Sequence, residues 1–157
     1  MDSVDFLGGI KLLITNAKYL KKIVKENSRI YVCSPLSAHT KGGIQLNMLS
    51  ARDKCNYLNG MFKDTNVKVW ASHSYLPMFL DDNVLSEREL AIKFGMELLS
   101  ISDILYVFGD KISSGMKNEI MYAISNNIPI VYESNVKHKL FEFLKEEWLY
   151  GENKCCI

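Results

Sequence analysis

The chain has 157 residues, of which 48% are apolar, and its formal net charge is +1. This length fits a single domain with one hydrophobic core. The balanced charge argues against a nucleic acid polymer or an anionic membrane as a partner, and no stretch reaches the ~20 apolar residues of a membrane-spanning helix. Asp2 and Asp5 argue against a secretion signal. We therefore expect a cytoplasmic protein.

The cysteines form no CxxC pair, and the three histidines are scattered along the chain. This spacing fits neither a zinc site nor a disulfide framework. We therefore expect no bound metal, no cofactor and no disulfide among Cys33, Cys55, Cys155 and Cys156.

The first segment, residues 4–26, has apolar residues at helical spacing, among them Leu13 and Ile14. We expect one domain over residues 1–157, in which residues 1–28 add an N-terminal helix. That helix would cover one side of a sheet or make a subunit contact.

The first strand is expected at 29–34, where an apolar run stops before a proline. The loop 36–43 follows, and it is rich in small and hydroxyl residues. Such a loop between a strand and a helix can hold a phosphate through its backbone N–H groups; a plain connecting loop is the alternative. The candidate phosphate-binding residues in this region are Ser34, Pro35, Ser37 and Gly43.

A helix at 45–62, a strand at 67–71 and a second helix at 86–101 are expected next. A capping box of Ser86 and Glu89 would start the second helix. The segment 72–82 between strand and helix is aromatic, contains a proline and ends in two acids, Asp81 and Asp82. Because it follows a strand, we expect it at the carboxyl edge of the sheet, either as a surface loop or as a lid over a ligand.

The chain is organised around residues 102–132, which read as strand, loop, helix and strand. The runs 104–108 and 128–132 are short, apolar and β-branched, as in buried strands. Two such strands joined by a helix make a parallel βαβ unit, and ligands bind beyond the carboxyl ends of parallel strands. The residues expected at this site, with either serine as the helix cap, are Ser113, Ser114, Gly115, Met116 and Glu119.

With a last helix at 136–149, the pattern gives four strands that alternate with helices. This predicts an α/β fold, a flavodoxin-like or Rossmann-like three-layer sandwich with a mainly parallel sheet of four to five strands. Glu119 is the most suggestive acid, since nucleophilic carboxylates are the usual device of glycosyl transfer. From spacing alone, an exposed helix glutamate is the alternative.

Two segments resemble the nucleoside 2-deoxyribosyltransferase superfamily. Residues 31–35, with the glycines at 42–43, are similar to its opening strand and loop, and residues 113–123 are similar to its second motif. The resemblance implies that Glu119 is the catalytic glutamate and that Tyr31 positions it. It further implies that Ser113 contacts the phosphate, as in the branch that hydrolyses 2-deoxynucleoside 5-phosphates.

A closer similarity is to uncharacterised bacterial and phage proteins of the same fold, over about residues 29–132. Their shared segments add His73 and Arg88 to the candidate substrate-binding residues. One position departs from the superfamily: an acid expected before the strand at 104–108 falls on Gly95. Other acids, among them Asp81 and Asp82, would have to contact the sugar or base in its place.

The resemblance thus implies hydrolysis or transfer of the N-glycosidic bond of a nucleotide or nucleoside. An alternative is a binding module that holds a nucleotide or an ADP-ribose-like signal without chemistry, which the missing acid at Gly95 favours. A third is an interaction protein that assembles through its N-terminal helix and the helix containing Trp148. A homodimer or larger homo-oligomer is expected in each case.

Overall fold

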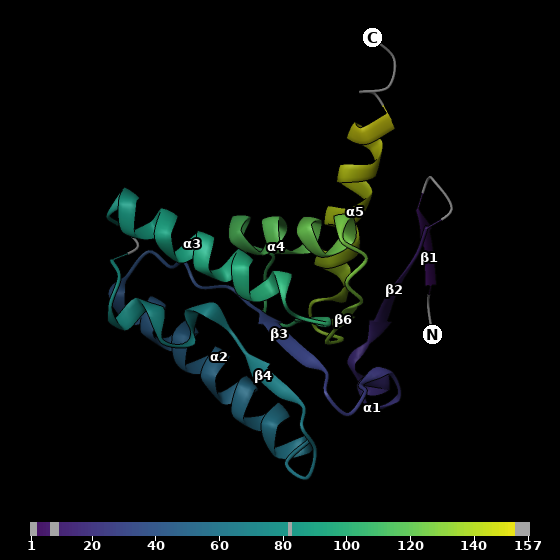
Figure 1. Cartoon of the computed structure of the whole chain (residues 1–157). Helices are drawn as coiled ribbons and strands as arrows, with labels where there is room; N and C mark the ends of the chain where they lie inside the picture. Colours follow the sequence, from purple (N-terminus) through teal and green to yellow (C-terminus); the bar gives the residue numbers. More distant parts are fainter. Residues whose placement is uncertain (1–2, 7–9, 82, 153–157) are drawn as a thin grey trace.

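A mainly parallel sheet forms the centre of the protein (Figure 1). The computed structural model describes residues 3–6, 10–81 and 83–152. Within them the strand order is β1-β2-β6-β5-β3-β4; only β1 is antiparallel to its neighbour, so five strands are parallel. This confirms the predicted flavodoxin-like or Rossmann-like α/β fold. The strands are β1 (Ser3–Phe6), β2 (Ile10–Asn16), β3 (Arg29–Cys33), β4 (Lys68–Trp70), β5 (Ile104–Val107) and β6 (Ile130–Tyr132).

Helices cover both faces of the sheet and make three layers. One face packs against α1 and α2, and the other against α3, α4 and α5 (Figure 1). Two short 3₁₀ turns, η2 (Ser72–Ser74) and η3 (Leu76–Met78), follow β4, and η1 (Ala17–Tyr19) follows β2. The α-helices are α1 (Leu20–Ile23), α2 (Lys41–Met61), α3 (Leu85–Ser100), α4 (Ser114–Ser125) and α5 (Lys137–Glu152).

Strand β3 divides its side chains between the two layers. Ile30 and Val32 pack on the α2 side, while Tyr31 and Cys33 pack on the α4 side. This alternation is a property of any strand, because successive side chains point to opposite faces of the sheet. It sends a phenol and a thiol toward α4, the helix that carries Glu119.

The strand order places a switch point between β3 and β5. From β3 the chain moves outward to β4, and then returns to the other side of β3 to form β5 and, beyond it, β6. The chain leaves β3 toward α2 on one face of the sheet and leaves β5 toward α4 on the other, which opens a crevice at the carboxyl edge, the usual ligand position in open α/β sheets.

The predicted N-terminal helix is wrong. In its place, β2 pairs in parallel with β6 and β1 pairs with β2, and only the short η1 and α1 follow. Leu12 and Ile14 are buried on one face of the sheet, and Thr15 is buried as well. A short apolar run fits both the period of a helix and that of a strand. The open edge of β6 supplied the hydrogen-bonding partners that favoured a strand.

Two helix starts differ from the prediction. Helix α2 begins at Lys41, because the Thr40 side chain accepts a hydrogen bond from the Gly43 N–H and caps the helix there. Helix α3 follows Val84 and has no side-chain cap, so the predicted capping box is absent. Large apolar residues lie exposed on both helices, namely Leu46, Leu49, Leu90, Ile92 and Phe94.

Gly109, two residues after the end of β5, has a backbone conformation that only glycine adopts easily. Its φ is +123°, and a Cβ at this position would lie 2.6 Å from the Pro35 Cδ. The loops after β3 and β5 therefore approach each other closely at this point, and an L side chain would push them apart. Together, Pro35 and Gly109 fix the two loops that border the crevice.

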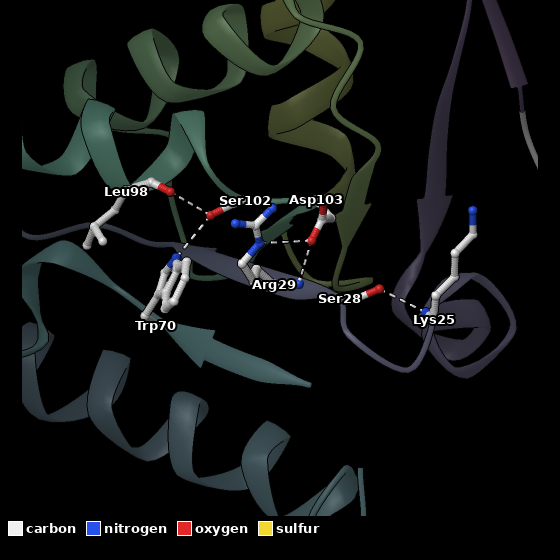
Figure 2. A network of polar contacts seen from close by, with 7 residues as sticks. All are labelled: Lys25, Ser28, Arg29, Trp70, Leu98, Ser102 and Asp103. Atoms are coloured by element: carbon white, nitrogen blue, oxygen red, sulfur yellow. Dashed lines mark hydrogen bonds and ion pairs between the residues drawn. The ribbon is translucent and has the colours of Figure 1, made fainter. Parts of the chain in front are cut away.

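The amino edge of the sheet is closed by polar contacts (Figure 2). The Trp70 Nε1–H donates to the Ser102 hydroxyl at 2.9 Å, which donates to the Leu98 carbonyl at 2.7 Å. The Asp103 carboxylate accepts from both the backbone N–H and the guanidinium of Arg29, at 2.8 and 3.3 Å. Each of these side chains is used to join strands and helices, so this edge has a structural role.

Candidate functional site

A pocket of about 500 Å³ opens at the carboxyl edge of the sheet, at the switch point. Its walls come from the loop after β3, the start of α2, the η2–η3 segment, α3 and the start of α4. The structure brings most of the sequence-predicted residues to this one pocket. Those that line it are Ser34, Ser37, His73, Asp81, Arg88, Ser113, Ser114, Gly115, Met116 and Glu119.

The remaining predicted residues lie elsewhere. Tyr31 is fully buried behind Glu119. Pro35 packs against Gly109 rather than the pocket, and Gly43 uses its N–H to bond the Thr40 side chain, so neither lines the site. Asp82 lies outside the described residues.

Glu119 stands at the inner wall of the pocket because of its register on α4. Met116 and Ala123, three residues before and four after it, are buried, so Glu119 shares the apolar side of the helix. Its side chain is half-buried, since one part opens on the pocket and the rest is enclosed by protein. The sequence pattern alone favoured an exposed glutamate, which this register contradicts.

Two side chains of β3 hold the Glu119 carboxylate. The Tyr31 hydroxyl donates to Glu119 Oε1 at 2.6 Å, and the Cys33 thiol interacts with the same carboxylate. Burial raises the pKa of Glu119 to about 6, and the hydrogen bonds from Tyr31 and Cys33 hold it from rising further. Burial and the neighbouring carboxylate raise the pKa of Tyr31 well above its usual value, so the phenol keeps its proton.

Beside Tyr31, a serine and a glycine that both line the pocket complete this group. The Ser72 hydroxyl lies 2.9 Å from the Tyr31 hydroxyl. Gly95 of α3 packs directly over the pair, and a Cβ there would lie 3.1 Å from the Ser72 Oγ and 3.2 Å from the Tyr31 hydroxyl. Ser72 and Tyr31 therefore closely fill the space next to Gly95.

A second polar pair stands beside the carboxylate. The Ser34 hydroxyl lies 2.8 Å from His73 Nε2, and both residues are buried and line the pocket. Burial lowers the pKa of His73 to about 4, so the imidazole is neutral at neutral pH. Neutral histidine can donate or accept a hydrogen bond here without adding charge.

The part of the pocket that is lined by the starts of α2 and α4 suits an anion. The first turns of α2 and α4 both contribute to its lining, and their exposed N–H groups carry partial positive charge. Ser113 caps α4, since its hydroxyl accepts from the Met116 N–H at 3.3 Å, which confirms the predicted helix start. Lys41, at the first position of α2, adds a full charge, and sequence reasoning missed it.

Asp81 lies at the rim of the pocket and is exposed. Hydrogen bonds from the Asn83 backbone and side chain, with a smaller effect of Lys41, lower the pKa of Asp81. The carboxylate of Glu87 accepts from the Asp81 N–H at 2.5 Å and so fixes this turn before α3. An ionised carboxylate is thus available at the mouth of the site.

An apolar wall completes the pocket. Its part in residues 76–79 belongs to the segment expected at the carboxyl edge, whereas the sequence did not indicate the parts from α2 and α3. Among these side chains, only Ile92 and Met96 of α3 are four residues apart, a spacing from which a shared helix face could be predicted. The wall consists of Met48, Leu76, Met78, Phe79, Ile92 and Met96.

The fold and the pocket define the class: an α/β domain with a carboxylate in a ligand-sized crevice at the topological switch point. A family of domains of unknown function (DUF7768) matches residues 28–133, which is more than half of the chain. The chain belongs to this family. The matched range runs from just before β3 to just after β6 and includes the whole pocket. A comparison with curated proteins finds no match.

Two further observations concern what the described part of the chain lacks. In it, His, Cys, Asp and Glu side chains nowhere gather in groups of three or more that could hold a metal ion. No helix within these residues has the length and apolar character required to cross a membrane.

Proposed function

We propose that the protein cleaves the N-glycosidic bond of a nucleotide or nucleoside, with Glu119 as the nucleophile. One observation carries the proposal: a carboxylate whose pKa is about 6 opens on a 500 Å³ pocket while Tyr31 and Cys33 hold it from behind. Such a group is ionised at neutral pH and only partly solvated, which suits attack on an electrophilic sugar carbon. The resemblance to the nucleoside 2-deoxyribosyltransferase superfamily supports the same role.

The pocket divides into regions that match the parts of a nucleotide. The helix starts at Ser113 and Lys41 suit the phosphate. The apolar wall, with Met48 and Ile92, suits the face of a base. The sugar would lie between them, with its anomeric carbon beside Glu119, and Asp81 and Arg88 would contact polar groups at the rim.

The reaction runs in two steps. The Glu119 carboxylate attacks the anomeric carbon, a C–O bond forms, and the C–N bond breaks with its electron pair going to the base, which takes a proton from solvent. A water molecule then attacks the same carbon and releases the sugar, the carboxylate leaves, and the water's proton goes to solvent. A second base in place of water gives transfer rather than hydrolysis.

The pH dependence follows from the carboxylate. Glu119 must be ionised to attack, so turnover should fall as the pH drops through about 6. His73, with a pKa of about 4, stays neutral across this range and should not contribute to the limb.

The test is a chromatographic assay for released base with a panel of deoxy- and ribonucleoside monophosphates, the free nucleosides, NAD and ADP-ribose. Base released by the wild type and not by Glu119→Ala, with the far-UV spectrum unchanged, is the expected result. Equal release by the Glu119→Ala protein would remove Glu119 from the mechanism. The substrate that reacts fastest would define the base and sugar.

A non-catalytic binding module is the second candidate, and Gly95 favours it. No acid stands at the position where the superfamily has one, and Ser72 and Tyr31 fill the space. In this case a panel member would raise the melting temperature of both the wild type and Glu119→Gln, and no base would be released.

We also propose that the protein assembles as a homodimer or larger homo-oligomer. Large apolar side chains lie exposed around the pocket mouth, with exposed fractions of 77% for Phe79 and 71% for Leu85. Faces of this kind are commonly covered in assemblies. Light scattering of the wild type and of Phe79→Ser measures the assembly directly; a monomeric wild type would end this proposal. Where the structure describes the N-terminal segment, strands β1 and β2 and the short α1 stand in place of the long helix expected to contribute.

A further inference from the structure

We infer that Ser72 is a positioning residue, which acts on the Glu119 carboxylate through Tyr31. The inference rests on the proposed function, because it concerns the state of the proposed nucleophile. It assigns a role to a residue that neither the motif positions nor the family match distinguishes.

The direction of the hydrogen bonds follows from counting protons. Tyr31 has one hydroxyl proton, and it is donated to Glu119 Oε1 at 2.6 Å. The 2.9 Å contact between Ser72 and Tyr31 must then have the serine as donor and the phenol oxygen as acceptor. The chain therefore runs from Ser72 to Tyr31 to Glu119.

A chain with this direction strengthens its last bond. An acceptor that receives one hydrogen bond becomes a better donor in the next, since each bond polarises its neighbour. The Ser72 hydroxyl thus makes the Tyr31 proton a stronger donor to the carboxylate, and so favours the ionised form of Glu119. The buried surroundings of Tyr31 increase this effect, because little water competes there.

Gly95 is the residue that makes the chain possible. A Cβ at this position would lie 3.1 Å from the Ser72 Oγ, 3.3 Å from the Ser72 Cβ and 3.2 Å from the Tyr31 hydroxyl. Any side chain there, an acid included, would displace Ser72 or Tyr31. The glycine therefore leaves the space that the Ser72 hydroxyl of η2 occupies beside Tyr31.

The test is the pKa of Glu119 itself, read from the side-chain carboxyl signal of protein labelled with ¹³C-glutamate and assigned by its loss in Glu119→Gln. In Ser72→Ala we expect this pKa to rise by about half a unit or more, which corresponds to a fraction of the free energy of one hydrogen bond. Ser74→Ala is the matched control, since Ser74 is buried in the same turn and contacts Cys55 rather than Tyr31. It should leave the pKa of Glu119 unchanged.

Two further variants keep the inference falsifiable. Gly95→Ala retains every hydroxyl but crowds Ser72 and Tyr31, and should raise the pKa of Glu119 in the same direction. In a Tyr31→Phe background, Ser72→Ala should add no further shift, because the serine acts only through the phenol. An unchanged pKa in Ser72→Ala, or an equal shift with and without the Tyr31 hydroxyl, would overturn the inference.

The outcome separates this inference from the proposed function. The carboxyl titration needs no substrate, so it decides the role of Ser72 even if no panel member releases a base. If base is released, the acid limb of kcat should move to higher pH in Ser72→Ala by the same amount as the pKa. A fall in kcat at all pH values without movement of the limb would indicate a merely structural role and refute the inference.

Discussion

The two edges of the sheet use carboxylates in opposite ways. At the amino edge, Asp103 is open to solvent and both of its bonds go to Arg29, so it serves to join two strands (Figure 2). At the carboxyl edge, Glu119 is half-buried, its donors stand behind it, and its free side faces a pocket. The amino edge satisfies its polar groups at little energetic cost, whereas the carboxyl edge keeps an acid in a position that costs stability.

This difference separates a structural acid from a functional one. Burial raises the pKa of Glu119. The Asp103 side chain is 46% exposed and lies at the surface. A strained or costly arrangement in a pocket is typical of sites that are retained for function. The contrast between the two acids can be tested by their effects on activity and on stability.

The activity contrast between the two acids should be the largest effect. Glu119→Gln should lower base release at least about a thousandfold, or about 4 kcal/mol in the activation barrier. Asp103→Asn, the matched change at the other edge, should leave release within about twofold, because the Asp103 carboxylate bonds Arg29 and does not line the pocket. Comparable losses in the two variants would show that the edges do not differ in the proposed way.

The buried imidazole should give the protein a pH-dependent stability. His73 has a folded pKa of about 4, below its unfolded value of 6.5, so the unfolded state binds the proton more tightly. The free energy of unfolding should therefore rise by about 3 kcal/mol between pH 4 and 6.5 because of this residue. Urea titrations of the wild type and of His73→Gln measure it, and equal pH slopes in the two proteins would contradict the prediction.

Glu119 should act in the opposite sense. Its folded pKa of about 6 lies above its unfolded value of 4.5, so the folded state binds the proton more tightly. This residue should lower the free energy of unfolding by about 2 kcal/mol as the pH rises from 4.5 to 6. Since His73 titrates over the same range, the effect is read as the free energy of unfolding of Glu119→Gln minus that of the wild type, which should increase by about 2 kcal/mol as the pH rises through this range; a constant difference would count against it.

At the amino edge, Trp70→Phe should cost stability without touching function. The change removes the 2.9 Å hydrogen bond to Ser102, and we expect a loss of about 1 kcal/mol in the free energy of unfolding. Thermal unfolding measures this loss, and base release by the folded variant should match the wild type. A loss of release at a temperature where the variant is folded would mean that the amino edge affects the site.

Sequence reasoning reached the α/β class, the parallel βαβ unit of residues 102–132 and the start of α4 at one of two serines, of which the structure uses Ser113 as the cap. These features follow from local signals: β-branched apolar runs, a capping serine, and the rule that a helix between two buried strands makes them parallel. The same local logic failed at the N-terminus. Residues 10–16 fit both a helix and a strand, and the choice depended on the unpaired edge of β6, which is more than a hundred residues away.

The way in which the site is built around Glu119 depends on the tertiary structure. Glu119 is six residues into α4, and its inward position depends on how that helix lies on β3. The contacts of Ser72 with Tyr31, and the need for a glycine at 95, join β3, η2 and α3. Local patterns carry no information on such contacts, because side chains distant in sequence meet only when the helices pack on the sheet.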